Sequence, residues 1–122
     1  MELRKRLNEI KRQLKEDIHD KDIHYMVKID RLMKYKALLG ASERDMAKIV
    51  GLSKSEVNRM SKVYRLPYKA KIYAVKMKIE KWAMIEISSM VENDQNIALK
   101  HLYAGRIKTR QDVFKAVVIN ER

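Results

Sequence analysis

The sequence predicts an all-α fold, a compact bundle of six to seven short helices. Apolar residues recur at three- and four-residue spacings along most of the 122-residue chain, and strand-like alternation is absent. All three glycines and the single proline fall at predicted helix ends. A chain of this length builds one domain with a modest core. The absence of cysteine excludes a disulfide scaffold and any thiolate metal site.

Residues 2–18 predict an amphipathic helix. Leu3, Leu7, Ile10 and Leu14 form an apolar seam among basic residues, but the heptad phase fails at Ile18. The seam therefore pairs with a second copy or packs on its own domain, and we assign residues 1–21 to a possible dimerisation arm. A membrane-surface helix is disfavoured because the seam lacks Trp and Phe. The remaining chain divides into a helical domain at 22–119 and a tail at 120–122.

A second helix is expected to end at Gly40 and to begin at Asp20 or Asp22 as N-cap, although a continuous helix from the first is the alternative. Acidic pairs such as Glu16 and Asp20 fit a solvated surface better than a metal site. The three histidines show no ligand spacing, and the sequence contains no glycine-rich phosphate loop. With no nucleophile beside a base, we predict that the chain is not an enzyme and uses no metal or cofactor.

The central stretch from Ser42 to Pro67 predicts a helix-turn-helix. Ser42 is a natural N-cap for the first helix, with Asp45 three residues on, and this helix ends at Gly51, a residue that tolerates positive φ. A capping box, in which Ser53 pairs with the glutamate three residues later, begins the second helix. A small residue in the first helix and a buried branched residue in the second match the spacing of this motif.

The polar side of the second helix suits a major groove, because Arg pairs with guanine and Asn with adenine. The residues expected to contact bases are Lys54, Ser55, Asn58, Arg59 and Lys62. The residues expected to contact phosphates are Ser42, Arg44, Ser53, Arg65, Lys69, Lys71 and Lys76. Two alternatives stay open, a helical hairpin with an ordinary solvated face and a helix-turn-helix that contacts only protein.

The formal net charge of +12 and the sequence pI near 9.9 favour a nucleic-acid partner. The excess is largest between residues 41 and 81, where eleven basic side chains accompany four acidic ones. Charge alone does not establish a nucleic-acid partner, since lysine-rich surfaces also serve solubility.

Four further helices are expected after Pro67. They cover about 68–75 with Ile72 and Val75 inward, about 80–91, a segment that begins at Asn93 or Asp94 and ends at Gly105, and a last segment opened by Thr109 and Asp112. Their inward positions are expected to include Val113, Phe114, Val117 and Val118 in the last segment. Trp82 is interpreted as a core anchor rather than a base-stacking platform.

Residues from about 22 to 117 resemble the central DNA-binding domain of ParB-type plasmid and chromosome partition proteins. Residues 42–47 match the family's Thr-x-x-Glu-Leu-Ala entry, residues 50–57 its Gly-x-Ser-x-x-x-Val core, and residues 64–67 its Leu-Pro exit. Residues 94–98 and 105–110 resemble its Glu-x-Gln-x-x-Ala and Gly-Leu-Ser-Val-Arg segments. The family's Gly-His-Ala-Arg stretch is Lys-Trp-Ala-Met at 81–84, and its preceding nucleotide-binding domain has no counterpart, so CTP binding is not expected.

This resemblance implies an all-helical module that binds a duplex site, often as a dimer. The expected function is sequence-specific binding of double-stranded DNA, as a small transcriptional regulator or as a centromere-binding partition-type protein of a plasmid, virus or related element. We expect a homodimer in the cytoplasm, associated with the nucleoid or a plasmid, with no membrane and no small-molecule substrate. A non-specific architectural DNA-binding protein and a helical protein-interaction adaptor are the alternatives.

Overall fold

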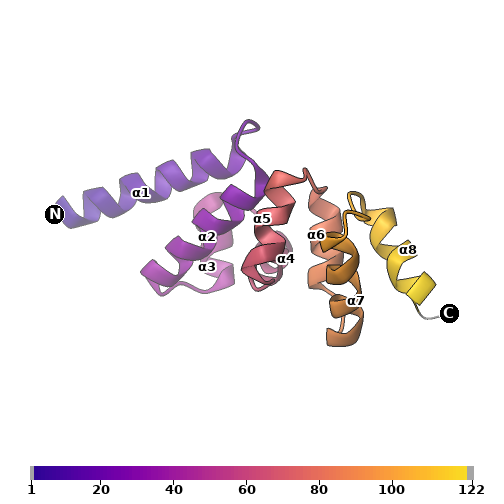
Figure 1. The fold of residues 1–122 in the computed structure, drawn as a ribbon. Helices are drawn as coiled ribbons and strands as arrows, with labels where there is room; N and C mark the ends of the chain where they lie inside the picture. The colour runs from indigo at the N-terminus through magenta and orange to yellow at the C-terminus, as the bar shows by residue number, and fades with distance from the viewer. Residues whose placement is uncertain (1, 121–122) are drawn as a thin grey trace. The chain divides into compact units, whose positions relative to one another are not determined.

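The computed structural model describes the backbone of residues 2–120 and the side chains of residues 2–118. Within this range the chain is all-helical and has no strand (Figure 1). The helices are α1 (Glu2–His19), α2 (Tyr25–Leu39), α3 (Glu43–Val50), α4 (Lys54–Tyr64), α5 (Tyr68–Lys76), α6 (Lys81–Ser88), α7 (Glu92–Tyr103) and α8 (Arg110–Asn120). The described residues therefore form eight helices, and the predicted number of six to seven is wrong. Residues 20–24 leave the helical conformation, so α1 and α2 are separate helices and the alternative of one continuous helix is wrong.

The chain divides into two compact units, the first ending at Ser61 and the second beginning at Lys62. The boundary lies inside α4, three residues before its end. The predicted boundary between residues 21 and 22 falls within the first unit, in the turn that separates α1 from α2.

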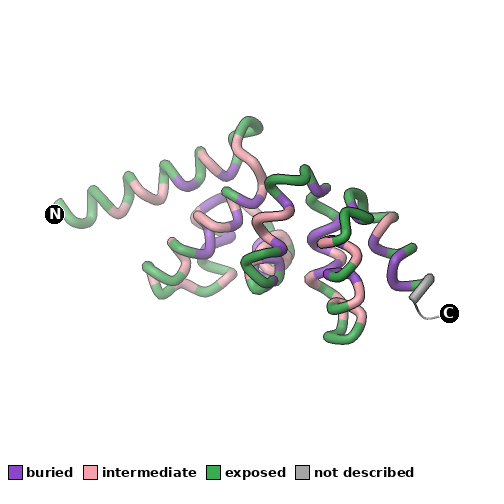
Figure 2. Tube along the Cα trace, viewed as in Figure 1, coloured by how far each residue is buried: buried purple, intermediate pink, exposed green. Residues whose placement is uncertain are grey.

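The first unit buries one face of each of its first three helices. Leu14 of α1, Leu32 of α2 and Met46 of α3 are each at most 2% exposed. The seam of α1 is buried only toward its C-terminal end, since Leu3 is 71% exposed whereas Leu14 is 2% exposed (Figure 2). α1 contacts α2 and α3, and these contacts use the C-terminal half of its seam.

The N-cap of α2 differs from the prediction. His24, rather than Asp20 or Asp22, caps the helix, because its Nδ1 accepts a hydrogen bond of 3.0 Å from the backbone N–H of Met26. Asp20 instead accepts from the N–H of Asp22 within the turn. An imidazole nitrogen can cap a helix only while it is unprotonated, which links this helix end to pH.

The second unit has its own buried set, drawn from α5 to α8. Ala74, Ile87, Leu102 and Val113 are each at most 1% exposed. The pairs α6 with α8, α7 with α8 and α5 with α7 are in contact. The start of α6 is joined to the segment before α8, where the N–H of Glu80 donates to the Lys108 carbonyl at 2.8 Å.

Several predicted inward positions of the second unit are wrong. Val75, Phe114 and Val118 are 43%, 45% and 49% exposed, because Ala70 and Ala74 occupy the buried side of α5, and Ala116 with the correctly predicted Val113 and Val117 occupies that of α8. Trp82 is 42% exposed and is not a core anchor. Its ring lies 5.6 Å from the Arg110 guanidinium, a cation–π distance.

Other boundaries shift by a few residues. α7 begins with Val91 as N-cap, without a side-chain cap, rather than with Asn93 or Asp94. The predicted start of α8 is confirmed, since the Thr109 hydroxyl accepts from the N–H of Asp112 and the Asp112 carboxylate accepts from the N–H of Thr109. The Asp112 carboxylate accepts hydrogen bonds from the backbone N–H groups of Lys108 and Thr109, and these bonds hold the pKa of Asp112 below its usual value.

Candidate nucleic-acid interface

The segment from α3 to α4 is built by two reciprocal capping boxes. Ser42 Oγ accepts from the N–H of Asp45 at 3.1 Å, and Asp45 in turn accepts from the N–H of Ser42. Ser53 Oγ accepts from the N–H of Glu56 at 3.1 Å, and Glu56 accepts from the N–H of Ser53 at the same distance. Each serine hydroxyl acts as acceptor in its cap and so keeps its hydrogen to donate.

A tight turn joins the two helices. Gly51 adopts φ 70° in the left-handed region, and the N–H of Leu52 donates to the Ala47 carbonyl at 3.0 Å. A residue with a side chain is strained at this φ, which explains the glycine. Ala47 is 6% exposed and Val57 is fully buried, so the small and branched residues hold the positions that the sequence predicted for them.

The helix α1 covers this turn. His19 Nε2 lies 2.7 Å from the Val50 carbonyl oxygen, at the C-terminal end of α3. A Cβ built on Gly51 would lie 3.4 Å from Lys15 Cε and 3.5 Å from His19 Nε2, which is ordinary van der Waals contact. The C-terminal turns of α1 therefore support the α3–α4 turn.

The predicted base-contacting residues of the first unit differ in exposure. Lys54 and Ser55 are exposed in the first turn of α4, whereas Asn58 and Arg59 are half-buried one turn later. Arg44, a predicted phosphate contact, is exposed in the first turn of α3. The two capping serines, Ser42 before α3 and Ser53 before α4, are also exposed. None of these side chains lies in the core of the first unit.

Asn58 has a partner that the sequence did not indicate. Its Nδ2 donates to Glu43 Oε2 at 3.1 Å, a bond that joins α4 to the first turn of α3. A carboxylate only accepts hydrogen bonds, so the amide nitrogen of Asn58 faces Glu43 and its oxygen faces away. No spacing rule finds this pair, because the two residues are 15 apart and meet only through the turn.

The predicted site residues of the second unit fall into two groups. Lys62, Arg65, Lys69 and Lys76 are exposed, whereas Lys71 is half-buried. Lys71 Nζ donates to the Tyr64 carbonyl at 2.9 Å and lies 4.3 Å from the centre of the Tyr64 ring. It therefore binds the C-terminal end of α4, a structural role that competes with phosphate contact.

Lys69 is also engaged, because its Nζ lies 4.4 Å from the centre of the Tyr103 ring. The Tyr103 ring meets Tyr73 edge to face, with ring centres 5.3 Å apart, and burial together with Tyr73 raises the pKa of the Tyr103 hydroxyl. The Lys69 side chain is itself exposed and keeps most of its hydration, so Lys69 remains able to approach a phosphate.

Two other kinds of site, a metal cluster and a membrane-spanning helix, are absent from the described residues. No cluster of three or more His, Cys, Asp or Glu in this part of the chain could hold a metal ion. None of the described helices combines the length and the apolar character needed to cross a membrane.

Comparisons with protein-family models, with curated proteins and with solved structures found no match to this chain.

Proposed function

We propose that this chain binds double-stranded DNA in a sequence-specific manner and that α4 enters the major groove. The supporting observation is the division of α4 into two sides. Val57 is fully buried, whereas Lys54 and Ser55 are exposed and Asn58 and Arg59 keep part of their surface in solvent. Side chains of these types form hydrogen bonds to base edges in the major groove.

The dimensions of α4 fit this role. The helix has 11 residues, which corresponds to about 16 Å at 1.5 Å per residue, and a major groove about 12 Å wide admits an α-helix. The capping boxes at the starts of α3 and α4 and the tight turn between them fix the angle between the two helices. A rigid pair of this kind holds its side chains in register with the bases.

The biological setting that we propose is a small transcriptional regulator or a partition-type protein, acting as a homodimer on nucleoid or plasmid DNA. Selection of bound duplexes from a random pool tests sequence-specific binding, and sizing of the complex tests the homodimer. We expect an enriched consensus, and for a dimer a palindrome with half-sites about 34–36 Å apart or a multiple of that distance. A pool that stays random after selection would contradict sequence-specific binding.

Arg59→Ala tests the role assigned to α4. We expect it to weaken binding to the selected site by about 1–3 kcal/mol and to relax the base preference at one position. The matched control is Lys76→Ala, because Lys76 is exposed on α5 and is assigned to phosphates. Lys76→Ala should weaken binding to all duplexes alike. It should also reduce by about one the slope of the logarithm of affinity against the logarithm of salt concentration. An unchanged consensus for Arg59→Ala would show that α4 does not contact bases through this residue.

A non-specific architectural DNA-binding protein is the second candidate, and the net charge of +12 favours it because charge alone supplies non-specific affinity. Competition with random duplex at fixed salt separates the two candidates. A specific binder should keep a preference of roughly 10³-fold or more for its site, whereas an architectural protein should show none.

A further inference from the structure

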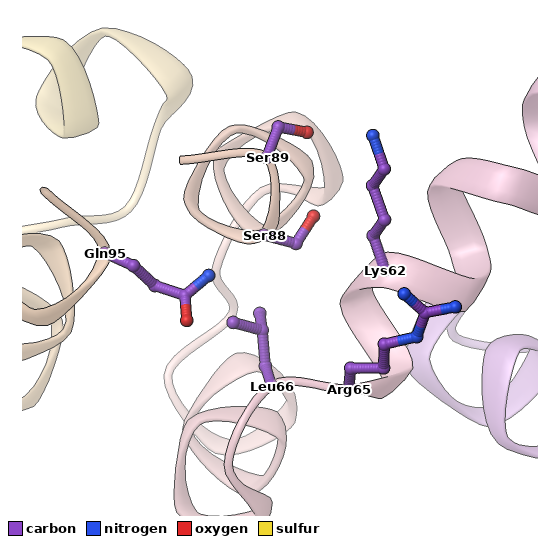
Figure 3. Close-up of a pocket in the computed structure, with 6 residues that line it drawn as sticks. All are labelled: Lys62, Arg65, Leu66, Ser88, Ser89 and Gln95. Carbon is purple, nitrogen blue, oxygen red and sulfur yellow. The ribbon is translucent and has the colours of Figure 1, made fainter. Parts of the chain in front are cut away.

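The second unit contains a pocket of about 290 Å³ between the C-terminal end of α4, the C-terminal end of α6 and the first turns of α7 (Figure 3). It is lined by Lys62, Arg65, Leu66, Ser88, Ser89 and Gln95. Lys62 lies on α4, Ser88 ends α6 and Gln95 lies on α7. The end of α4 and the two consecutive helices α6 and α7 therefore supply the lining.

The charge of this lining has one sign. Lys62 and Arg65 are cations with exposed side chains, and the lining contains no carboxylate. The remaining polar residues are two hydroxyls and one amide, which carry no charge. An anion is therefore the ligand that gains electrostatic energy in this pocket, and Arg with Lys is the pair of side chains that proteins use most for phosphate.

The end of α6 would oppose an anion if its last carbonyls were bare, because a helix C-terminus carries partial negative charge. Nearby side chains donate hydrogen bonds to these carbonyls and offset most of their partial negative charge. Ser88 Oγ and Ser89 Oγ donate to the Ile85 carbonyl at 2.8 and 2.9 Å, and Gln95 Nε2 donates to the Ile87 carbonyl at 3.0 Å. These bonds satisfy the carbonyls and hold the polar wall of the pocket in one arrangement, and the Gln95 amide keeps a second N–H to donate.

We propose that this pocket binds a phosphate group, with Lys62 and Arg65 as the charged contacts and Gln95 as a neutral donor. A volume of about 290 Å³ lies just below the range for small-ligand sites, about 300–1,000 Å³, and accommodates a phosphate with an attached sugar. The phosphate belongs either to the backbone of a DNA duplex or to a free phosphate ester.

A phosphate that comes from a DNA duplex requires the proposed DNA-binding function. Binding of a free phosphate ester in the pocket does not require it. Lys62 follows Arg59 by three residues on the same helix, so a strand whose bases contact α4 would pass within reach of Lys62. On this proposal Lys62 contacts phosphate rather than a base, which differs from the role expected from the sequence.

The test is an NMR titration of the full chain that follows the side-chain amide of Gln95 and the backbone amides of Ser88 and Ser89. One arm adds inorganic phosphate, and the other adds a short duplex of mixed sequence. We expect saturable shifts at these amides in at least one arm. Lys62→Gln should weaken the binding that causes the shifts about tenfold.

Two further variants control this test. Lys100→Gln removes the same charge from an exposed position on α7 outside this pocket and should leave the shifts unchanged. Gln95→Glu keeps the length of the side chain, places a carboxylate in the pocket and should abolish the shifts of the Ser88 and Ser89 backbone amides. The dispersion of the same spectra shows whether each variant is folded, and Lys62→Gln carries the test if Gln95→Glu is not.

The outcomes of the titration distinguish the two sources of phosphate and can overturn the proposal. Saturable shifts with phosphate alone would support the pocket with a free phosphate ester as ligand, and shifts only with the duplex would support a backbone phosphate. Absence of shifts in both arms, or equal effects of Lys62→Gln and Lys100→Gln, would overturn the proposal. If phosphate binds in the pocket but no duplex binds anywhere, the proposed DNA function fails and the pocket stands.

Discussion

The hydrogen bond between Asn58 and Glu43 fixes which end of the asparagine amide faces α3. Asn recognises adenine through both its oxygen and its nitrogen, so the orientation of the amide decides whether the pairing forms. A glutamine at position 43 could either donate or accept, and it would leave this orientation undetermined. Glu43 therefore acts as a positioning residue for Asn58, provided that α4 contacts bases.

We expect Glu43→Gln to lower the preference for adenine at one position of the selected site by about 1–3 kcal/mol. The readout is the consensus selected from a random pool, because loss of a negative charge alone raises affinity for every sequence. Glu92→Gln is the matched control, since Glu92 is an acidic residue in the first turn of α7. A consensus that is identical for the wild-type chain and Glu43→Gln would contradict this role.

His24 links the start of α2 to pH. Its Nδ1 accepts from the N–H of Met26, and burial lowers the pKa of His24 below its ordinary value of 6.5. Because the folded chain binds this proton less readily than the unfolded chain, the cap contributes fully above the ordinary pKa. The contribution is lost as pH falls through the lowered pKa of the folded state.

We expect His24→Asn to reduce the loss of stability between about pH 7.5 and pH 5. Asparagine caps a helix without titrating, and a lost cap costs about 1 kcal/mol. Urea unfolding of both proteins at the two pH values measures the difference. His101→Asn is the control, because His101 lies in the last turn of α7 and is not a cap. Parallel pH profiles for the wild-type chain and His24→Asn would contradict the prediction.

At the scale of elements, the helix ends show why some of the fold follows from sequence and some does not. Ser42, Ser53 and Thr109 cap the helices predicted for them, because each cap depends on hydrogen bonds within a few residues. Burial of Trp82 and Phe114 was predicted wrongly, because it depends on which distant helices cover them. The Asn58–Glu43 bond and the pocket lined by Lys62, Arg65 and Gln95 likewise depend on contacts between elements.

The end of α5 contains a residue that its backbone does not favour. Lys78 adopts φ 52°, and the next N–H, that of Ile79, donates to the Ala74 carbonyl at 3.1 Å. This is the bonding of a helix end that normally carries glycine in the left-handed position. Each of the three glycines in the chain has a positive φ at the end of a helix, and Lys78 takes that conformation without being a glycine.

We expect Lys78→Gly to raise the free energy of unfolding by about 0.5–1 kcal/mol. Relief of the left-handed strain, about 1–2 kcal/mol, exceeds the entropy that glycine adds to the unfolded chain, about 0.4–1 kcal/mol. Lys76→Gly is the matched control, since it removes the same charge from a helical position and should cost about 1 kcal/mol. Urea unfolding followed by circular dichroism measures both, and equal changes would contradict the assignment of strain to Lys78.

For the whole molecule, the dominant electrostatic property is the net charge of +12. Like charges on one chain repel, and this repulsion lowers the stability of the folded state. Attractive pairs such as Arg12 with Glu9 and Glu16, or Lys34 with Asp30, lie at exposed positions. Exposed pairs contribute about 0–1 kcal/mol each, so the repulsive term should determine how stability responds to salt.

We therefore expect stability and DNA affinity to change in opposite directions when salt is added. Screening shortens from about 30 Å at 0.01 M to about 8 Å at 0.15 M ionic strength, so the free energy of unfolding in urea should rise with potassium chloride. Affinity for duplex should fall, by about 10³–10⁵ between 50 and 200 mM salt if six to ten phosphates are contacted. The control is the double variant Lys5→Gln with Arg6→Gln, at two exposed positions of α1, which should show a smaller rise in stability because less repulsion remains to be screened. A free energy of unfolding that falls with salt would mean that ion pairs outweigh repulsion in this chain.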